Sequence, residues 1–92
     1  MKDYYAILGI ASDASGGAVR AAYRRKAGQL HPDRNTDPSA TDRFRDVQEA
    51  YETLSDSDLR HAYDENRRRN LLENPLETAR EIWRSYMEGV LQ

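Results

Sequence analysis

The sequence predicts a small all-α domain, and three observations support this prediction. Apolar residues recur at intervals of three and four along every long segment, as they do on one face of a helix. No segment shows the strict alternation of a half-buried β-strand. The 92-residue chain is 33% charged and 38% hydrophobic, which is typical of a helix-rich chain with a small core. Such a core leaves little room for a deep active site, so we expect function at the surface.

A short first helix is expected over residues 3–9, followed by a loop over residues 10–17. The residues available for burial in this helix are Tyr4, Tyr5 and Leu8. Gly9 can end the helix, because glycine relieves the left-handed strain past a helix end. Ser15 is placed to cap the next helix, because its hydroxyl can accept a free backbone N–H.

The second and third helices are expected over residues 16–30 and 39–54, joined by a loop over residues 31–38. Their apolar stripes consist of Val19, Ala22, Tyr23, Ala27 and Leu30, and of Phe44, Val47, Tyr51 and Leu54. Pro32 disfavours helical geometry at the residue before it, so the second helix should end there. Ser39 is the expected cap of the third helix. The short loop favours an antiparallel hairpin.

A short fourth helix is expected to open at Asp56 and Ser57 and to run to about Glu65, and an amphipathic helix is expected over residues 76–91. The inward residues of the fourth helix are expected to be Leu59, Ala62 and Tyr63. The run Arg67-Arg68-Arg69-Asn70 is interpreted as a helix end or linker, and Pro75 suits a first helical turn. The apolar side of the last helix consists of Leu76, Ala79, Ile82, Trp83, Tyr86, Val90 and Leu91. This side should pack against the rest of the chain or against a further partner.

The charges are segregated between the two helices of the hairpin. Residues 18–30 carry four basic and no acidic side chains, whereas residues 39–54 carry four acidic and two basic ones. The net charge of −2 argues against a dedicated nucleic-acid binder. Segregation of this kind instead favours docking that is guided by charge. Because cysteine is absent, disulfides and thiolate metal sites are excluded, and we expect no metal or other cofactor.

The cytoplasm is the expected compartment. The first residues lack the apolar run of a signal peptide. No stretch approaches the ~20 apolar residues that span a bilayer, so no membrane partner is expected. The lack of cysteine is also common in a reducing compartment.

The tripeptide His31-Pro32-Asp33 lies in the loop of the predicted hairpin. It can be a rigid turn, because proline fixes one dihedral angle and aspartate bonds nearby backbone groups. It can also project the Asp33 carboxylate from a stiff loop toward a cation of a partner. The basic side chains of the preceding helix are Arg20, Arg24, Arg25 and Lys26. They can form a solvated face, but the absence of intermixed acids favours a docking surface.

The motifs of this chain resemble, in order and spacing, those of the J domain, the module of DnaJ-type (heat-shock-forty) co-chaperones. The matching segments are Asp3-Tyr4-Tyr5-Ala6-Ile7-Leu8-Gly9, Ala22-Tyr23-Arg24-Arg25-Lys26-Ala27, His31-Pro32-Asp33-Arg34-Asn35, Phe44, Glu49-Ala50-Tyr51-Glu52-Thr53-Leu54-Ser55-Asp56 and Arg60-His61-Ala62-Tyr63-Asp64. The resemblance implies the J-domain fold for residues 1–66, with the short first and fourth helices and the hairpin between them. Residues 67–92 are then a basic linker and the C-terminal amphipathic helix.

The resemblance also implies a function. J domains bind the ATP state of a DnaK-type (heat-shock-seventy) chaperone and accelerate its ATP hydrolysis, which promotes client capture, and they have no catalytic chemistry of their own. The residues expected to bind this partner are His31, Pro32, Asp33, Arg20, Arg24, Arg25, Lys26, Arg34 and Asn35. The departures from the common family pattern are Lys26, Gly28, Gln29 and Leu30, and they bear on affinity and partner choice. A monomer is expected.

Two other functions fit parts of the sequence. A small helical nucleic-acid-binding domain would use the basic second helix, although the acidic third helix argues against it. A gel-shift assay at moderate salt would reveal that activity. An enzyme would need a nucleophile and an oxyanion pocket beside a His31–Asp33 dyad, and neither is evident. Hydrolysis without any added chaperone would reveal it.

Overall fold

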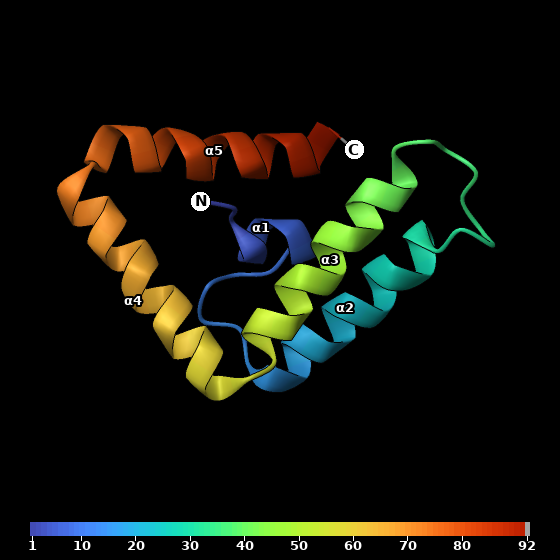
Figure 1. The fold of residues 1–92 in the computed structure, drawn as a ribbon, viewed down its shortest axis with the longest axis horizontal. Coiled ribbons are helices and arrows are strands. Elements are labelled where there is room, and N and C mark those ends of the chain that lie inside the picture. The colour runs from blue at the N-terminus through green and yellow to red at the C-terminus, as the bar shows by residue number, and fades with distance from the viewer. Residues whose placement is uncertain (92) are drawn as a thin grey trace.

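The computed structural model describes residues 1–91, with side chains through Glu88, and this part of the chain contains helices and loops but no strand. The helices are α1 (Tyr4–Leu8), α2 (Gly16–Leu30), α3 (Ala40–Leu54), α4 (Ser57–Glu73) and α5 (Pro75–Leu91). Helices α2 and α3 form an antiparallel hairpin, and α1 packs against both of them (Figure 1). Helices α4 and α5 meet at a sharp corner, and α5 returns over α1. The all-α prediction and the predicted hairpin are confirmed.

The ends of the first two helices follow the predicted local rules. Gly9 ends α1 with φ 73°, in the left-handed region that glycine adopts most easily. The Ser15 hydroxyl oxygen accepts the Ala18 N–H at 3.1 Å and so caps α2. At the other end, His31 leaves helical geometry at φ −59° and ψ 135°, as expected for a residue before proline. The bounds of α2 are those that the sequence predicts.

Two glycines give opposite predictions for substitution by alanine. Gly9→Ala should destabilise the fold by about 1–2 kcal/mol, because a side chain at positive φ is strained. Gly28→Ala should stabilise it by about 0.5–1 kcal/mol, because this helical position has open space where a Cβ would be added. Urea denaturation of both variants measures the difference, and equal changes of the same sign would contradict this account.

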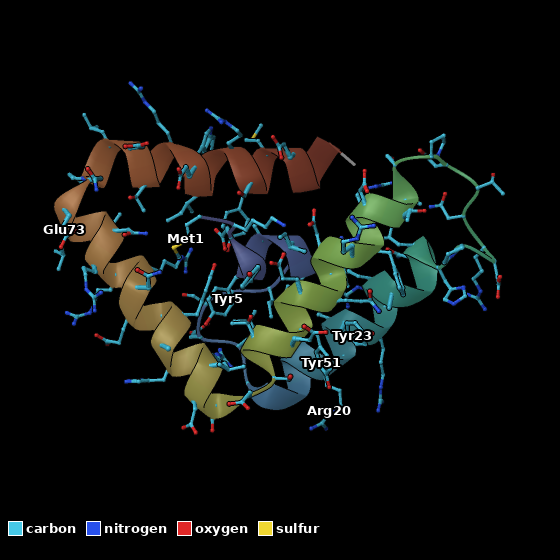
Figure 2. The ribbon with its side chains drawn as sticks, in the orientation of Figure 1. Met1, Tyr5, Arg20, Tyr23, Tyr51 and Glu73 are labelled. Carbon is cyan, nitrogen blue, oxygen red and sulfur yellow. The ribbon has the colours of Figure 1, made fainter. Side chains whose placement is uncertain are left out.

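The core lies where α1 crosses the α2–α3 hairpin. Its buried members are Tyr5, Leu8, Val19, Ala22, Leu30, Ala40, Val47, Ala50 and Leu54. The rings of Tyr23 and Tyr51 stack at 4.1 Å between centroids and close the outer side of the hairpin, as Figure 2 shows. Phe44 is half-buried and packs against this cluster, in agreement with its predicted place in the hairpin.

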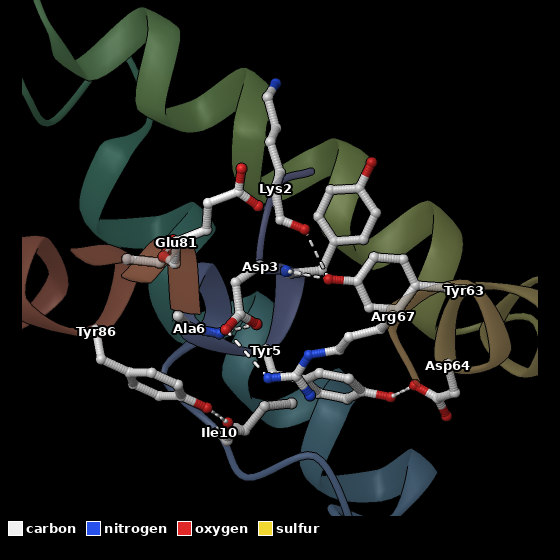
Figure 3. Close-up of polar contacts among 12 residues, drawn as sticks. Lys2, Asp3, Tyr5, Ala6, Ile10, Tyr63, Asp64, Arg67, Glu81 and Tyr86 are labelled. Atoms are coloured by element: carbon white, nitrogen blue, oxygen red, sulfur yellow. Dashed lines mark hydrogen bonds and ion pairs between the residues drawn. The ribbon is translucent and has the colours of Figure 1, made fainter. Parts of the chain in front are cut away.

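Helix α4 differs from the prediction in length. It continues to Glu73, so the run Arg67-Arg68-Arg69-Asn70 is neither a helix end nor a linker. The Arg67 guanidinium donates to the buried Asp3 carboxylate at 3.2 Å and lies over the Tyr5 ring (Figure 3). The inward side chain at this point of α4 is therefore an arginine. A search for apolar inward residues would have placed the end of the helix before it.

The face of α4 that turns toward α1 also differs from the prediction. Leu59 and Ala62 are exposed, Leu59 by 52%, and of the three predicted inward residues only Tyr63 contacts the core. The inward face is polar and aromatic, and it consists of Arg60, Tyr63, Asp64 and Arg67. These residues recur at intervals of three and four, so they share one helix face. They hydrogen-bond to α1 instead of packing as aliphatic side chains.

Tyr63 connects this face of α4 to the beginning of the chain. Its phenolic oxygen accepts the Tyr4 N–H at 2.9 Å, and its O–H donates to the Lys2 carbonyl oxygen at 2.7 Å. Burial raises the pKa of the Tyr63 phenol well above its usual value. The neutral phenol is therefore part of the folded state, and it fixes α1 against α4.

Helix α5 confirms one prediction and corrects another. It begins at Pro75, one residue before the predicted range and with proline in its first turn as expected, and it packs on α1 and α4. Its apolar residues do not all face inward, because Ile82 and Tyr86 are half-buried whereas Leu76, Ala79 and Trp83 are exposed. The side chains of Val90 and Leu91 lie outside the described residues. In the part of the chain that the structure describes, no helix combines the length and apolar character required to cross a membrane.

Candidate functional site

The loop over residues 31–38 lies at the free end of the α2–α3 hairpin, far from the α4–α5 corner (Figure 1). Its turn is made by the His31 carbonyl oxygen, which accepts the Arg34 N–H at 2.9 Å and the Asn35 N–H at 3.0 Å. The Asn35 side chain donates to the Gln29 carbonyl oxygen at 3.3 Å and accepts the Asp37 N–H at 3.0 Å. Asn35 therefore ties both sides of the loop together.

Within this turn, His31 and Asp33 have different surroundings. The Asp33 side chain is 89% exposed, so its carboxylate projects into solvent. The Asp33 N–H donates to His31 Nδ1 at 3.2 Å. The same Nδ1 lies 3.6 Å from the Asp33 carboxylate. The edge of the His31 ring packs against Phe44, with 5.8 Å between centroids.

Ser39, at the end of the loop, does not cap the third helix with its side chain as the sequence predicts. Ser39 occupies the N-cap position of α3, but its backbone is already helical and its side chain makes no cap hydrogen bond. Its hydroxyl and its N–H instead each donate to the Asp37 carboxylate at 2.8 Å. These two bonds, that of the backbone N–H first, lower the pKa of Asp37. Asp37 thus fixes the loop where it enters α3.

A cationic face runs along α2 from the middle of the helix toward this loop. Arg20, Arg24 and Arg25 are exposed, and Arg20 points away from the hairpin in Figure 2. Within residues 1–91 none of the three has an ion-pair partner, whereas Arg67 pairs with Asp3. The helix rises about 1.5 Å per residue, so this face begins about 16 Å from the tripeptide. We call Arg20, Arg24 and Arg25 the α2 cationic face.

The acidic side chains of α3 are partly neutralised within the chain. Lys2 Nζ lies 3.0 Å from the Asp46 carboxylate and 2.8 Å from that of Glu49. The bond from Lys2 is the main cause of the lowered pKa of Glu49. The charge segregation in the sequence therefore leaves more uncompensated charge on α2 than on α3.

Not all of the predicted site residues lie on one surface. His31, Pro32, Asp33 and Arg34 form an exposed tip. Lys26 is only half-exposed and lines a cavity of about 290 Å³ beside α1, together with Leu30 and Glu88. Asn35 acts within the loop through its hydrogen bonds, so its contribution to the site is to hold the tip in place.

The polar network that joins α4 to α1 was not expected from the sequence. The Tyr5 hydroxyl donates to Asp64 at 2.5 Å and accepts from Arg60 Nε at 3.2 Å, and Arg60 also donates to the Ala14 carbonyl oxygen at 2.6 Å. Figure 3 shows Tyr5 and Arg67 at the centre of this network. Polar side chains spaced by three, four and seven residues on one helix would have indicated it.

Comparisons with known proteins agree with the resemblance. The family model "DnaJ domain" matches residues 3–64. Among curated relatives, "Chaperone protein DnaJ" of Prochlorococcus marinus (strain MIT 9313) is 52% identical over 65 residues, 71% of this chain and 17% of the relative. The protein of the same name from Methanosarcina acetivorans is 51% identical over 63 residues, 68% of this chain and 16% of that relative.

The chain thus spans about a sixth of the length of the curated relatives that it matches, and the match lies in their J domain. The family model covers well over half of the chain, and the exposed tip and the α2 cationic face lie inside the matched range. This chain belongs to the DnaJ domain family.

Proposed function

We propose that this chain is a J-domain co-chaperone that binds the ATP state of a DnaK-type (heat-shock-seventy) chaperone and stimulates its ATP hydrolysis. The observation that carries this proposal is the exposed Asp33 carboxylate on a loop that Asn35 and Asp37 hold rigid, next to the uncompensated α2 cationic face. The relatives that match this chain are named as chaperone proteins, which supports the proposal.

The two parts of the site would act in sequence. The α2 cationic face attracts an acidic surface of the chaperone over a distance and speeds the encounter. The tip then engages a cation of the chaperone through Asp33, in a charge-assisted hydrogen bond of the strong kind. Because Asn35 already fixes the loop, little conformational entropy is lost on binding. The hydrolysis itself takes place in the chaperone, and this chain supplies no catalytic group.

We place the co-chaperone in the cytoplasm, and we assign the partner-binding function to residues 1–66. Lys26 and Arg34 extend the binding surface from either side of the tip, and His31 and Pro32 set its shape. Nucleic acid is not a partner under this proposal, because α3, in the same hairpin as the cationic face, carries four acidic side chains against two basic ones.

Charge reversal on α2 tests the binding surface. We expect Arg24→Glu combined with Arg25→Glu to raise the dissociation constant for the ATP-bound chaperone about tenfold, because each exposed ion pair contributes up to about 1 kcal/mol. The slope of the logarithm of affinity against the logarithm of salt concentration should flatten. Titration calorimetry at several salt concentrations measures both quantities.

Arg69→Glu is the matched control, because Arg69 is an equally exposed arginine on α4. It should leave both the affinity and the salt dependence close to those of the unaltered chain. An equal loss for the control and for the α2 variant would show that total charge, not the α2 cationic face, determines binding.

A further inference from the structure

Helix α5 is attached to the rest of the domain by one of its faces. Thr78 is buried, and its hydroxyl donates to the Asn70 carbonyl oxygen at 2.9 Å. The terminal amine of Met1 lies 3.5 Å from the Glu81 carboxylate, and the Tyr86 hydroxyl donates to the Ile10 carbonyl oxygen at 3.4 Å. These contacts fix the rotation of α5 about its axis, so its opposite face points into solvent.

The outward face of α5 is apolar. Leu76 is 75% exposed and Trp83 is 68% exposed, and Met87 and Ala79 lie on the same side at helical intervals. Helix α5 forms the outer edge of the molecule in Figure 1, with no other element beyond it. We call Leu76, Ala79, Trp83 and Met87 the α5 outer stripe. A stripe of this kind on a small domain indicates an interaction surface.

Charged residues follow the two largest members of this stripe with the same offset. Glu77 comes directly after Leu76, and Arg84 comes directly after Trp83, seven positions later. Seven residues are close to two helical turns, so the two charged side chains lie on one flank of the stripe. Neither has an ion-pair partner in the described part of the chain.

This arrangement is complementary to a second copy of itself. When two α5 helices lie antiparallel with Leu76 opposite Trp83 of the second copy, the two-fold axis passes close to Ala79. The same register places Glu77 beside Arg84 of the second copy, and symmetry repeats each contact. Flanking ion pairs of this type set the orientation of paired helices. Ala79 is small, so the helices can approach closely at the axis.

We propose that the α5 outer stripe pairs two copies of this chain in a weak, antiparallel, two-fold symmetric dimer. In this register the two α5 helices overlap over residues 75–84, a contact about 15 Å long. A contact of this length is smaller than the roughly 800 Å² per partner of a standard interface, so the dimer forms only at high concentration. Arg80 lies near the axis and faces its own counterpart, which weakens the pairing further. This proposal departs from the predicted monomer, and it uses none of the residues proposed to bind the chaperone.

Sedimentation equilibrium from about 10 μM to about 1 mM tests the dimer directly. We expect the mass to rise from monomer toward dimer across this range. The emission of Trp83, the only tryptophan, should shift to shorter wavelength in parallel, because the indole leaves water. Trp83→Ala should raise the dissociation constant at least about tenfold. Leu59→Ala, at an exposed leucine on α4, is the control and should change nothing.

A series of charge-swap variants distinguishes self-pairing in this register from nonspecific association. Arg84→Glu and Glu77→Arg should each weaken the dimer, because each brings like charges together across the two-fold axis. The double variant should restore association between two copies. If the stripe instead bound an unrelated acidic protein, the double variant would not recover that binding. Arg80→Gln should strengthen the dimer. A chain that stays monomeric at 1 mM, or a double variant that fails to recover, would overturn the proposal. Circular dichroism confirms that each variant keeps its helices.

Discussion

Asp33→Asn and His31→Gln should each abolish the stimulation of ATP hydrolysis that this chain gives to a DnaK-type chaperone. Asp33→Asn removes the negative charge from an 89%-exposed side chain and leaves its size nearly unchanged. A charge-assisted hydrogen bond loses about half of its strength when it becomes neutral. His31→Gln removes the ring that packs against Phe44 and the nitrogen that accepts the Asp33 N–H, so the carboxylate is no longer held in place. Single-turnover hydrolysis of ATP by the chaperone measures the effect.

The control for these variants is another exposed acid in the same hairpin. Asp42 on α3 has a side chain that is 81% exposed, and Asp42→Asn should keep full stimulation. The helical circular dichroism signal of all three variants should equal that of the unaltered chain, because no buried group changes. If Asp33→Asn stimulated hydrolysis normally, the tip would not be the functional site.

Tyr5→Ala should produce the largest loss of stability. Tyr5 is fully buried at the junction of α1, α3 and α4, and its hydroxyl bonds to Asp64 and Arg60. Replacing a buried aromatic side chain by alanine costs about 3–5 kcal/mol. Domains of this size have total stabilities near the lower end of about 5–15 kcal/mol, so the variant should be largely unfolded. The free energy of unfolding in urea measures the change.

Tyr5→Phe separates the ring from its hydroxyl. It keeps the packing but leaves Asp64 and Arg60 without one partner, so it should cost about 1–2 kcal/mol. Leu59→Ala should change stability by less than about 0.5 kcal/mol, because Leu59 is exposed. A Tyr5→Phe variant as unstable as Tyr5→Ala would mean that the hydrogen bonds, not the ring, hold α1 in place.

The sequence was sufficient to predict α1, α2 and α3, because local rules determine them. Gly9 and Ser15 act within one turn of their own positions, and Pro32 constrains its neighbour. Helix α4 depends on long-range contacts instead. Within the extended part of α4, Arg67 donates to Asp3, which is 64 residues away in the sequence, and no local pattern contains that contact. The same reason explains why Leu59 was predicted to be inside, since hydrophobic periodicity does not detect a polar inward face.

The candidate site, too, was predictable from the sequence only in part. Proline and neighbouring polar residues predict an exposed tip at His31-Pro32-Asp33, and the tip is exposed. The sequence could not separate Asn35, which fastens the loop, from the residues that project from it. Nor could it separate Lys26, which lines a cavity beside α1, from the exposed arginines next to it. Those distinctions depend on how α1 lies across the hairpin.

The most direct test of the central claim is a magnetic resonance titration of the isotope-labelled chain with an ATP-bound DnaK-type chaperone. We expect the amide signals of residues 31–35 and of Arg20, Arg24 and Arg25 to shift or broaden first, while those of α4 and α5 stay close to their free positions. A titration that perturbs α4 or α5 and leaves the tip and the α2 cationic face unchanged would contradict it.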